Sequence, residues 1–123
     1  MKTHAPIRFT QTEHDTYKRI LSTMRQLYPF VMGGNKPLPL HPDAIWRMKC
    51  DPYLPYSDED METFFRIWLQ RREYALQVCI LQCYYCDAGT ELEAIPDAII
   101  ADRAYQVAQF YKNVDLSTIG TKK

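Results

Sequence analysis

Helical spacing of apolar residues, interrupted by prolines and glycines, is the feature that most limits what this chain can fold into. In the first part of the chain, apolar residues recur three or four positions apart, which places them on one face of a helix. They are Tyr17, Ile20, Leu21, Met24, Leu27 and Tyr28. Thr12, followed by acids, predicts the start of this helix. Pro29 predicts its end.

A loop rich in proline and glycine comes next, and a short helix follows it. Residues 30–40 contain two glycines and two prolines, which favour an extended loop. A proline is favourable in the first turn of a helix, so Pro42–Lys49 is predicted to be helical. Its candidate core residues are Ile45, Trp46 and Met48.

The longest helical pattern begins after Ser57. This serine precedes three acids, which is typical of a capped helix start. The helix is predicted to run from Asp58 to about Leu81, with a break near residues 70–72 as an alternative. Its apolar pattern consists of Met61, Phe64, Phe65, Trp68, Tyr74, Ala75 and Val78.

The last third of the chain predicts a small hairpin and a final helix. Residues 83–86 and 91–93 flank a turn at residues 87–89, which is typical of a hairpin. A helix is predicted from Pro96 to about Lys112. One face of that helix carries Ile99, Ile100, Ala104, Val107, Ala108 and Tyr111.

These elements predict one mostly α domain of the α+β class, with about five helices and one small β-hairpin. A length of 123 residues suits a single domain. We expect a flexible N-terminal arm at residues 1–11, the domain at residues 12–112 and a flexible C-terminal tail at residues 113–123.

Charge and hydropathy restrict the partners and the compartment. The net charge is zero, but residues 1–50 carry 8 Lys and Arg against 3 Asp and Glu, and residues 51–123 carry 7 against 12. Such asymmetry can produce a one-sided positive face. No apolar run approaches the ~18 residues that span a bilayer, and the N-terminus lacks an apolar signal core. We therefore expect a cytoplasmic protein with no membrane contact.

The cysteines give a weak signal for zinc. Cys79, Cys83 and Cys86 lie within eight residues, and Cys50 could supply a fourth ligand. This spacing is not a paired CxxC motif, and cysteine often serves as a small buried hydrophobic residue. We expect no metal, and a zinc-stabilised domain is the minor alternative.

Catalytic motifs are missing from the sequence. The three histidines, His4, His14 and His41, have no nearby residue that suggests a nucleophile and a base. No phosphate-binding loop, GxSxG or HExxH motif occurs. We expect a protein that is not an enzyme and needs no cofactor.

A mixture of basic and aromatic residues suits nucleic acid better than it suits catalysis. Its members are Lys36, Arg47, Lys49, Arg66, Arg71 and Arg72, with Trp68 and Tyr74. Arginine can contact phosphates, while Trp and Tyr can stack on bases. On pattern alone, however, a solvated helix face whose aromatic residues point into the core is the favoured interpretation, because charged helix faces are common.

The order of several short motifs resembles the ProQ/FinO family of RNA-binding domains. The matching features are Leu27-Tyr28-Pro29, Lys36-Pro37-Leu38, Tyr56-Ser57, Arg66-Ile67-Trp68, Tyr74, Gly89 and the helix from Pro96. The resemblance covers roughly residues 21–112. Its weight lies in the order and spacing of the motifs rather than in any single one.

This resemblance implies an RNA chaperone or post-transcriptional regulator. The implied partners are small regulatory RNAs or mRNA 3′ ends, bound at the base of a hairpin and its 3′ single-stranded tail. The RNA-binding residues that it implies are Lys36, Arg66, Trp68, Arg72 and Tyr74.

A protein-interaction module that keeps the fold is the alternative function. The small basic loop of the family, of Gly-Ala-x-Arg type, is Leu81-Gln82-Cys83-Tyr84 in this chain. The discriminating feature is whether the basic residues converge on one face, namely Lys36, Arg47, Lys49, Arg66 and Arg72. Acids interleaved with them would strengthen the case for a protein partner.

Overall fold

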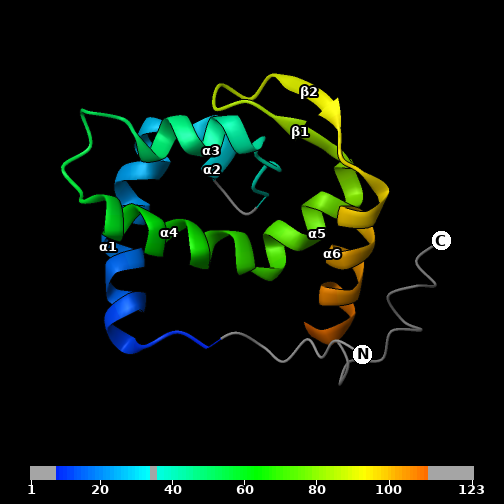
Figure 1. Ribbon diagram of the computed structural model, residues 1–123, viewed down its shortest axis with the longest axis horizontal. Coiled ribbons are helices and arrows are strands. Elements are labelled where there is room, and N and C mark those ends of the chain that lie inside the picture. The colour runs from blue at the N-terminus through cyan, green and yellow to red at the C-terminus, as the bar shows by residue number, and fades with distance from the viewer. Residues whose placement is uncertain (1–7, 34–35, 111–123) are drawn as a thin grey trace.

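The computed structural model describes residues 8–33 and 36–110, which form six helices and one two-stranded antiparallel hairpin (Figure 1). In chain order the elements are α1 (Gln11–Leu27), α2 (Pro29–Met32), α3 (Pro42–Lys49), α4 (Asp58–Gln70), α5 (Arg72–Leu81), β1 (Cys83–Tyr85), β2 (Glu91–Ala94) and α6 (Asp97–Phe110). The predicted mostly α fold with one small hairpin is confirmed. The predicted tail and residues 1–7 of the predicted arm lie outside the described residues.

Helices α1 and α6 stand at opposite ends of the molecule, and α4 and α5 run across the middle between them (Figure 1). Helix α1 contacts α4, and α6 contacts α5. The short helices α2 and α3 and the hairpin lie together on one side of the α4–α5 axis. Within the described residues, no helix is both long and apolar enough to span a membrane.

Helix α1 begins earlier than the sequence predicts. Its cap is Thr10 rather than Thr12: the Thr10 hydroxyl accepts a hydrogen bond from the backbone N–H of Glu13 at 3.1 Å. In return, the Glu13 carboxylate accepts one from the backbone N–H of Thr10 at 2.8 Å. This reciprocal pair is a capping box, which satisfies two N–H groups that the helix leaves free. The predicted arm therefore contributes the cap.

Pro29 both follows the first helix and begins the second. Tyr28 ends α1, and α2 starts directly at Pro29. Proline suits this position because the first turn of a helix needs no N–H from it. Helix α2 accounts for the difference between the six observed helices and the five expected.

Helix α3 has the predicted bounds, Pro42–Lys49, but only part of the predicted core face. Ala44 and Met48, four residues apart, are fully buried. Trp46 lies on the other side of this eight-residue helix, and 66% of its surface is exposed. The prediction that Trp46 belongs to the core is wrong, because α3 buries only the face that carries Ala44 and Met48.

The predicted break in the long helix occurs at Arg71. This residue has extended backbone angles and separates α4 from α5. The break leaves the last carbonyls of α4 without partners in its own helix. Two side chains of α6 provide hydrogen-bond donors for these carbonyls. Arg103 donates to the Leu69 carbonyl at 2.6 Å, and Gln106 donates to the Gln70 carbonyl at 3.3 Å.

The face predicted for the last helix is right for Ile100 and Val107, which are half-buried, and wrong for Ile99, Ala104 and Ala108. None of the 14 residues of α6 is buried, and Ile99, Ala104 and Ala108 are exposed. The half-buried residues include Ile100, Arg103, Gln106 and Val107. The hydrogen bonds of Arg103 and Gln106 to α4 fix this rotation of the helix. Tyr111, also predicted for this face, lies outside the described residues.

The hairpin is confirmed, and a third segment pairs with it. Cys83 lies opposite Ala94 and Tyr85 opposite Glu91, with a bulge between them. On its other side, the Tyr85 N–H donates to the Pro39 carbonyl at 2.8 Å, and the His41 N–H donates to the Tyr85 carbonyl at 3.0 Å. The chain after α2 is thereby fixed beside the sheet.

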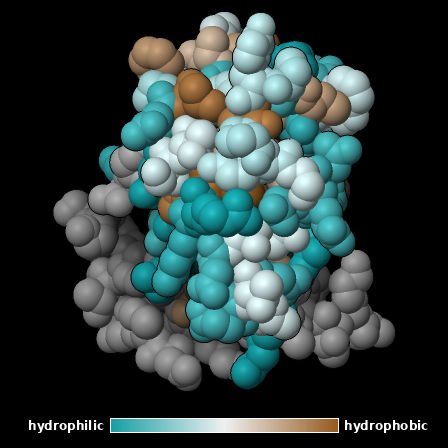
Figure 2. Space-filling view, turned by 90° about the vertical axis from the view of Figure 1, so that its left-hand side faces the viewer, coloured by the Kyte–Doolittle hydropathy of each residue, from teal (hydrophilic) through white to brown (hydrophobic). Residues whose placement is uncertain are grey.

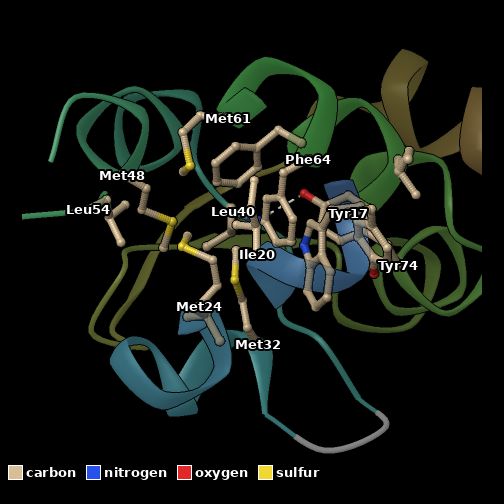
Figure 3. Packing of buried hydrophobic residues seen from close by; sticks show 14 of the residues in the cluster. Tyr17, Ile20, Met24, Met32, Leu40, Met48, Leu54, Met61, Phe64 and Tyr74 are labelled. Atoms are coloured by element: carbon tan, nitrogen blue, oxygen red, sulfur yellow. Dashed lines mark hydrogen bonds between the residues drawn. The ribbon is translucent and has the colours of Figure 1, made fainter. Parts of the chain in front are cut away.

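The core lies between α1 and α4 (Figure 3). Ile20 and Met24 from α1 and Met61 and Phe64 from α4 are at most 1% exposed. The cluster also includes Leu40, from the segment that pairs with β1, and Met48, from α3. Every member of the apolar pattern predicted between Met61 and Val78 is buried.

Candidate nucleic-acid interface

Two of the five predicted RNA-binding residues belong to the core. Trp68 is 1% exposed and stacks on Phe64, with 6.1 Å between the ring centroids. Tyr74 is 4% exposed, and its hydroxyl accepts a hydrogen bond from the backbone N–H of Leu40 at 2.9 Å (Figure 3). A base cannot reach either ring in this structure, so the expectation that they stack on RNA is wrong. Their helical spacing with Phe64 and Val78 already indicated the core.

The rings of Trp68 and Tyr74 instead support two arginines. The guanidinium of Arg71 lies 5.6 Å from the centroid of Trp68, and that of Arg103 lies 5.3 Å from the centroid of Tyr74. Burial raises the pKa of Tyr74, and it lowers the pKa of Arg103. These contacts position the end of α4 and the middle of α6 from inside the molecule.

Arg66 is exposed on α4 and faces the start of α1. Its guanidinium donates to the Glu13 carboxylate at 2.9 Å and lies 5.6 Å from the centroid of Phe9. Half of its side-chain surface is exposed. The pKa of Glu13 is lowered, first by the hydrogen bond from the Thr10 backbone and then by Arg66. Glu13 is therefore ionised at neutral pH and partly neutralises Arg66.

Arg71 and Arg72 extend the line of charge that begins at Arg66. Arg71 donates to the Tyr17 hydroxyl at 3.0 Å. Tyr17 follows Glu13 by one turn of α1, so α1 contacts Arg66 and Arg71 in succession. Glu73 lies 3.4 Å from Arg71 and 3.6 Å from Arg72.

We call these residues the arginine edge: Arg66, Arg71 and Arg72, together with the acids Glu13 and Glu73. Three guanidinium groups face two carboxylates, so the edge is positive by one charge. Partial burial opposes the charge of Glu73, but its own backbone N–H and the charges of Arg71 and Arg72 lower its pKa. Both carboxylates are thus ionised at neutral pH.

The remaining basic residues of the predicted set lie apart from this edge. Arg47 pairs with Asp87 at 3.4 Å, and Lys49 pairs with Glu62 at 2.8 Å. The pKa of Glu62 is lowered by its hydrogen bond from Lys49. Lys36 is exposed just before the segment that pairs with β1. No described contact connects Lys36 to the arginine edge.

Acids are interleaved with most of the predicted basic set. Residues 8–33 and 36–110 contain 11 Lys and Arg against 14 Asp and Glu, a net charge of −3. Figure 2 shows the end of the molecule on the left of Figure 1, where hydrophilic groups cover most of the surface and hydrophobic ones gather in the upper half. The arginine edge is therefore a local positive feature on a folded part that is acidic as a whole.

Phe9 contacts Arg66, although the sequence predicted it to lie in a flexible arm. It is half-buried and packs against the core cluster. A signal was available, because Thr10 with Glu13 fits the capping-box spacing and places Phe9 directly before the cap. The tertiary pairing of Glu13 with Arg66, 53 residues apart, has no local signal.

The described residues give no sign of a metal centre. No group of three or more His, Cys, Asp or Glu side chains within residues 8–33 and 36–110 is arranged to hold a metal ion. Cys83 is buried in β1, and its thiol donates to the Tyr84 and Leu92 carbonyls. Burial raises the pKa of the Cys83 thiol.

Comparison with known proteins gives no family for this chain. A scan against protein-family models found no match, and a search of curated proteins found none either.

Proposed function

We propose that this domain binds structured RNA through the arginine edge. The observation that carries the proposal is the alignment of Arg66, Arg71 and Arg72 by successive turns of α1 and by Glu73. The order of short motifs in the sequence, which resembles that of the ProQ/FinO family, also implies RNA binding. Lys36 is the further cation of this proposal, at a separate position.

The mechanism is an exchange of ion-pair partners. Arg66 is half exposed and pairs with Glu13 at the surface, where ion pairs contribute little because water competes for both charges. A phosphate can replace the Glu13 carboxylate and accept hydrogen bonds from the same guanidinium. Arg72, whose side chain is 57% exposed, can exchange Glu73 in the same way. The expected binding is weaker than that of a strongly basic domain, since two acids compete with the RNA.

Protein binding is a second candidate, which the charge distribution favours. Arg47, Lys49, Arg66 and Arg72 all have acidic neighbours. The folded part is also net negative, which opposes long-range attraction of RNA. A protein partner tolerates such a mixed surface better than a polyanion does.

An electrophoretic shift assay across a salt series tests the first proposal. The probe is a hairpin RNA with a 3′ oligo-U tail, and the same hairpin without its tail serves as the RNA control. Arg47→Ala is the matched protein control, because this arginine is similarly exposed but lies outside the arginine edge. Salt-sensitive, tail-dependent binding that survives Arg47→Ala would support the proposal.

The opposite result is equally informative. No shift of either RNA at low salt would reject RNA binding by this domain, because phosphate contacts are strongest when few counterions compete. A search for protein partners would then follow.

A further inference from the structure

A groove between α3 and the first turns of α4 has the chemistry of a receptor for a cationic side chain. It is lined by Trp46, Lys49, Cys50, Asp58 and Glu62. Trp46 and Lys49 come from α3, whereas Asp58 and Glu62 lie one turn apart on α4. None of these residues belongs to the arginine edge.

The charges of the groove are unequal. Lys49 and Glu62 form an ion pair of 2.8 Å, so each neutralises the other. Asp58 forms no ion pair with any residue in the described part of the chain, and it is exposed. The groove therefore has one uncompensated negative charge. The helix dipole at the start of α4 explains why an acid is tolerated there, but not why an aromatic ring is exposed beside it.

Trp46 presents an exposed aromatic ring in the same groove. Its side chain is 66% exposed, whereas Trp68, the other tryptophan of the chain, is buried. The face of an indole attracts a cation through its quadrupole. A guanidinium suits this combination better than an ammonium, because it can stack on the ring while it donates hydrogen bonds to a carboxylate.

We propose that this groove binds an arginine side chain of a protein partner, with Trp46 stacking on the guanidinium and Asp58 accepting its hydrogen bonds. The inference rests on the second candidate function, protein binding, and is independent of RNA binding by the arginine edge. One uncompensated carboxylate matches one positive charge of the partner.

The two tryptophans make the test direct. Each contributes one indole N–H signal to a ¹⁵N-correlated NMR spectrum of the full chain, so buried Trp68 is the internal control for exposed Trp46. The titrant is the end-blocked peptide Gly-Arg-Gly. The same peptide with citrulline in place of arginine is the neutral control, since it keeps the shape and loses the charge. Titration with the 3′-tailed hairpin RNA is a separate arm.

The expected result is a saturable shift of the Trp46 indole with the arginine peptide, while the Trp68 indole stays unchanged. Asp58→Asn and Trp46→Ala should each weaken binding by about threefold or more, followed in the variant without Trp46 through the Lys49 amide. Tyr53→Ala, which removes an aromatic ring that is 91% exposed outside the groove, should leave binding unchanged.

Three outcomes would overturn the inference. The first is no shift at millimolar peptide, and the second is an equal shift with the citrulline peptide. The third is a Trp46 shift on addition of RNA, which would assign the groove to the nucleic-acid surface. Because RNA binding is measured separately at the arginine edge, failure here does not count against the first proposal.

Discussion

Helix α1 packs on α4 through fully buried apolar side chains, whereas α6 packs at the other end of the molecule without a single buried residue. Ile20 and Met24 of α1 are 0% exposed and contact a core that includes Phe64. Helix α6 has only half-buried apolar side chains, such as Ile100, and its Arg103 and Gln106 hydrogen-bond to the carbonyls that end α4. Apolar burial thus stabilises one end, and directional polar contacts position the other.

This difference has a consequence for local stability. Elements with few buried apolar side chains open at lower free energy than the core does. We expect α6 to open while α1 and α4 remain folded.

Removal of a central core side chain should have the largest effect. Phe64→Ala deletes a ring that stacks on Tyr17 and Trp68, and it leaves a cavity beside both. We expect a loss of about 3–5 kcal/mol in the free energy of unfolding. Urea denaturation of the purified variant measures it. A loss below 1 kcal/mol, far under this range, would show that the α1–α4 core is not the main source of stability.

The polar contacts of α6 should have an intermediate effect. Arg103→Met keeps much of the side-chain volume but leaves the Leu69 carbonyl without its donor, which should cost roughly 1.5–3 kcal/mol. Hydrogen exchange should show faster exchange of α6 amides and unchanged exchange in α4. Arg72→Met, on an exposed arginine, is the matched control and should change stability by less than about 0.5 kcal/mol. Equal acceleration in α4 and α6 would contradict the proposed difference between the two ends.

The sequence predicted the apolar end of the molecule better than the polar end. Apolar residues at helical spacing, such as Phe64, Trp68 and Val78, are predictable because periodicity reflects burial directly. The cap of α4 at Ser57 and the start of α3 at Pro42 were predictable because their chemistry is local. The face of α6 was predictable only in part, since the contacts of Arg103 and Gln106 depend on carbonyls of α4 that become available through the break at Arg71.

The candidate site was predictable only in part. Arg66 and Arg72 are exposed as expected, but their pairing with Glu13 and Glu73 was not foreseen. Glu73 is a sequence neighbour of Arg72, whereas Glu13 reaches Arg66 only through the packing of α1 on α4. The resemblance implied that Trp68 and Tyr74 bind RNA. The apolar pattern of this chain predicted both for the core, where the structure places them.

A change in the exposed ion pair between Glu13 of α1 and Arg66 of α4 should affect RNA affinity more than it affects stability. Glu13→Gln removes the carboxylate that competes with phosphate for Arg66, so RNA affinity should rise by about twofold to fivefold. An electrophoretic shift with the tailed hairpin measures it. Glu62→Gln is the matched control at the acid that pairs with Lys49 instead. Unchanged or weaker binding in Glu13→Gln would argue against partner exchange at Arg66.

Acid should weaken the same surface contact by a small amount. The pKa of Glu13 is lowered from 4.5 in the folded state, so the folded state binds fewer protons than the unfolded state below that value. The resulting stabilisation is present above pH 4.5 and is lost as the pH falls through the lowered folded-state pKa. Thermal unfolding from about pH 6 to about pH 3 should show a slightly smaller acid-induced loss in Glu13→Gln. Identical curves for the wild type and the variant would rule out this contribution.

The most direct test of RNA binding by the arginine edge is the salt dependence of RNA affinity in Arg66→Ala. Each phosphate contact contributes about one unit to the slope of log affinity against log salt concentration. Arg66→Ala should bind the tailed hairpin more weakly, with a slope reduced by about one unit, and the Arg47→Ala control should be unchanged. A slope equal to that of the wild type would show that Arg66 does not contact phosphate and would contradict RNA binding by the arginine edge.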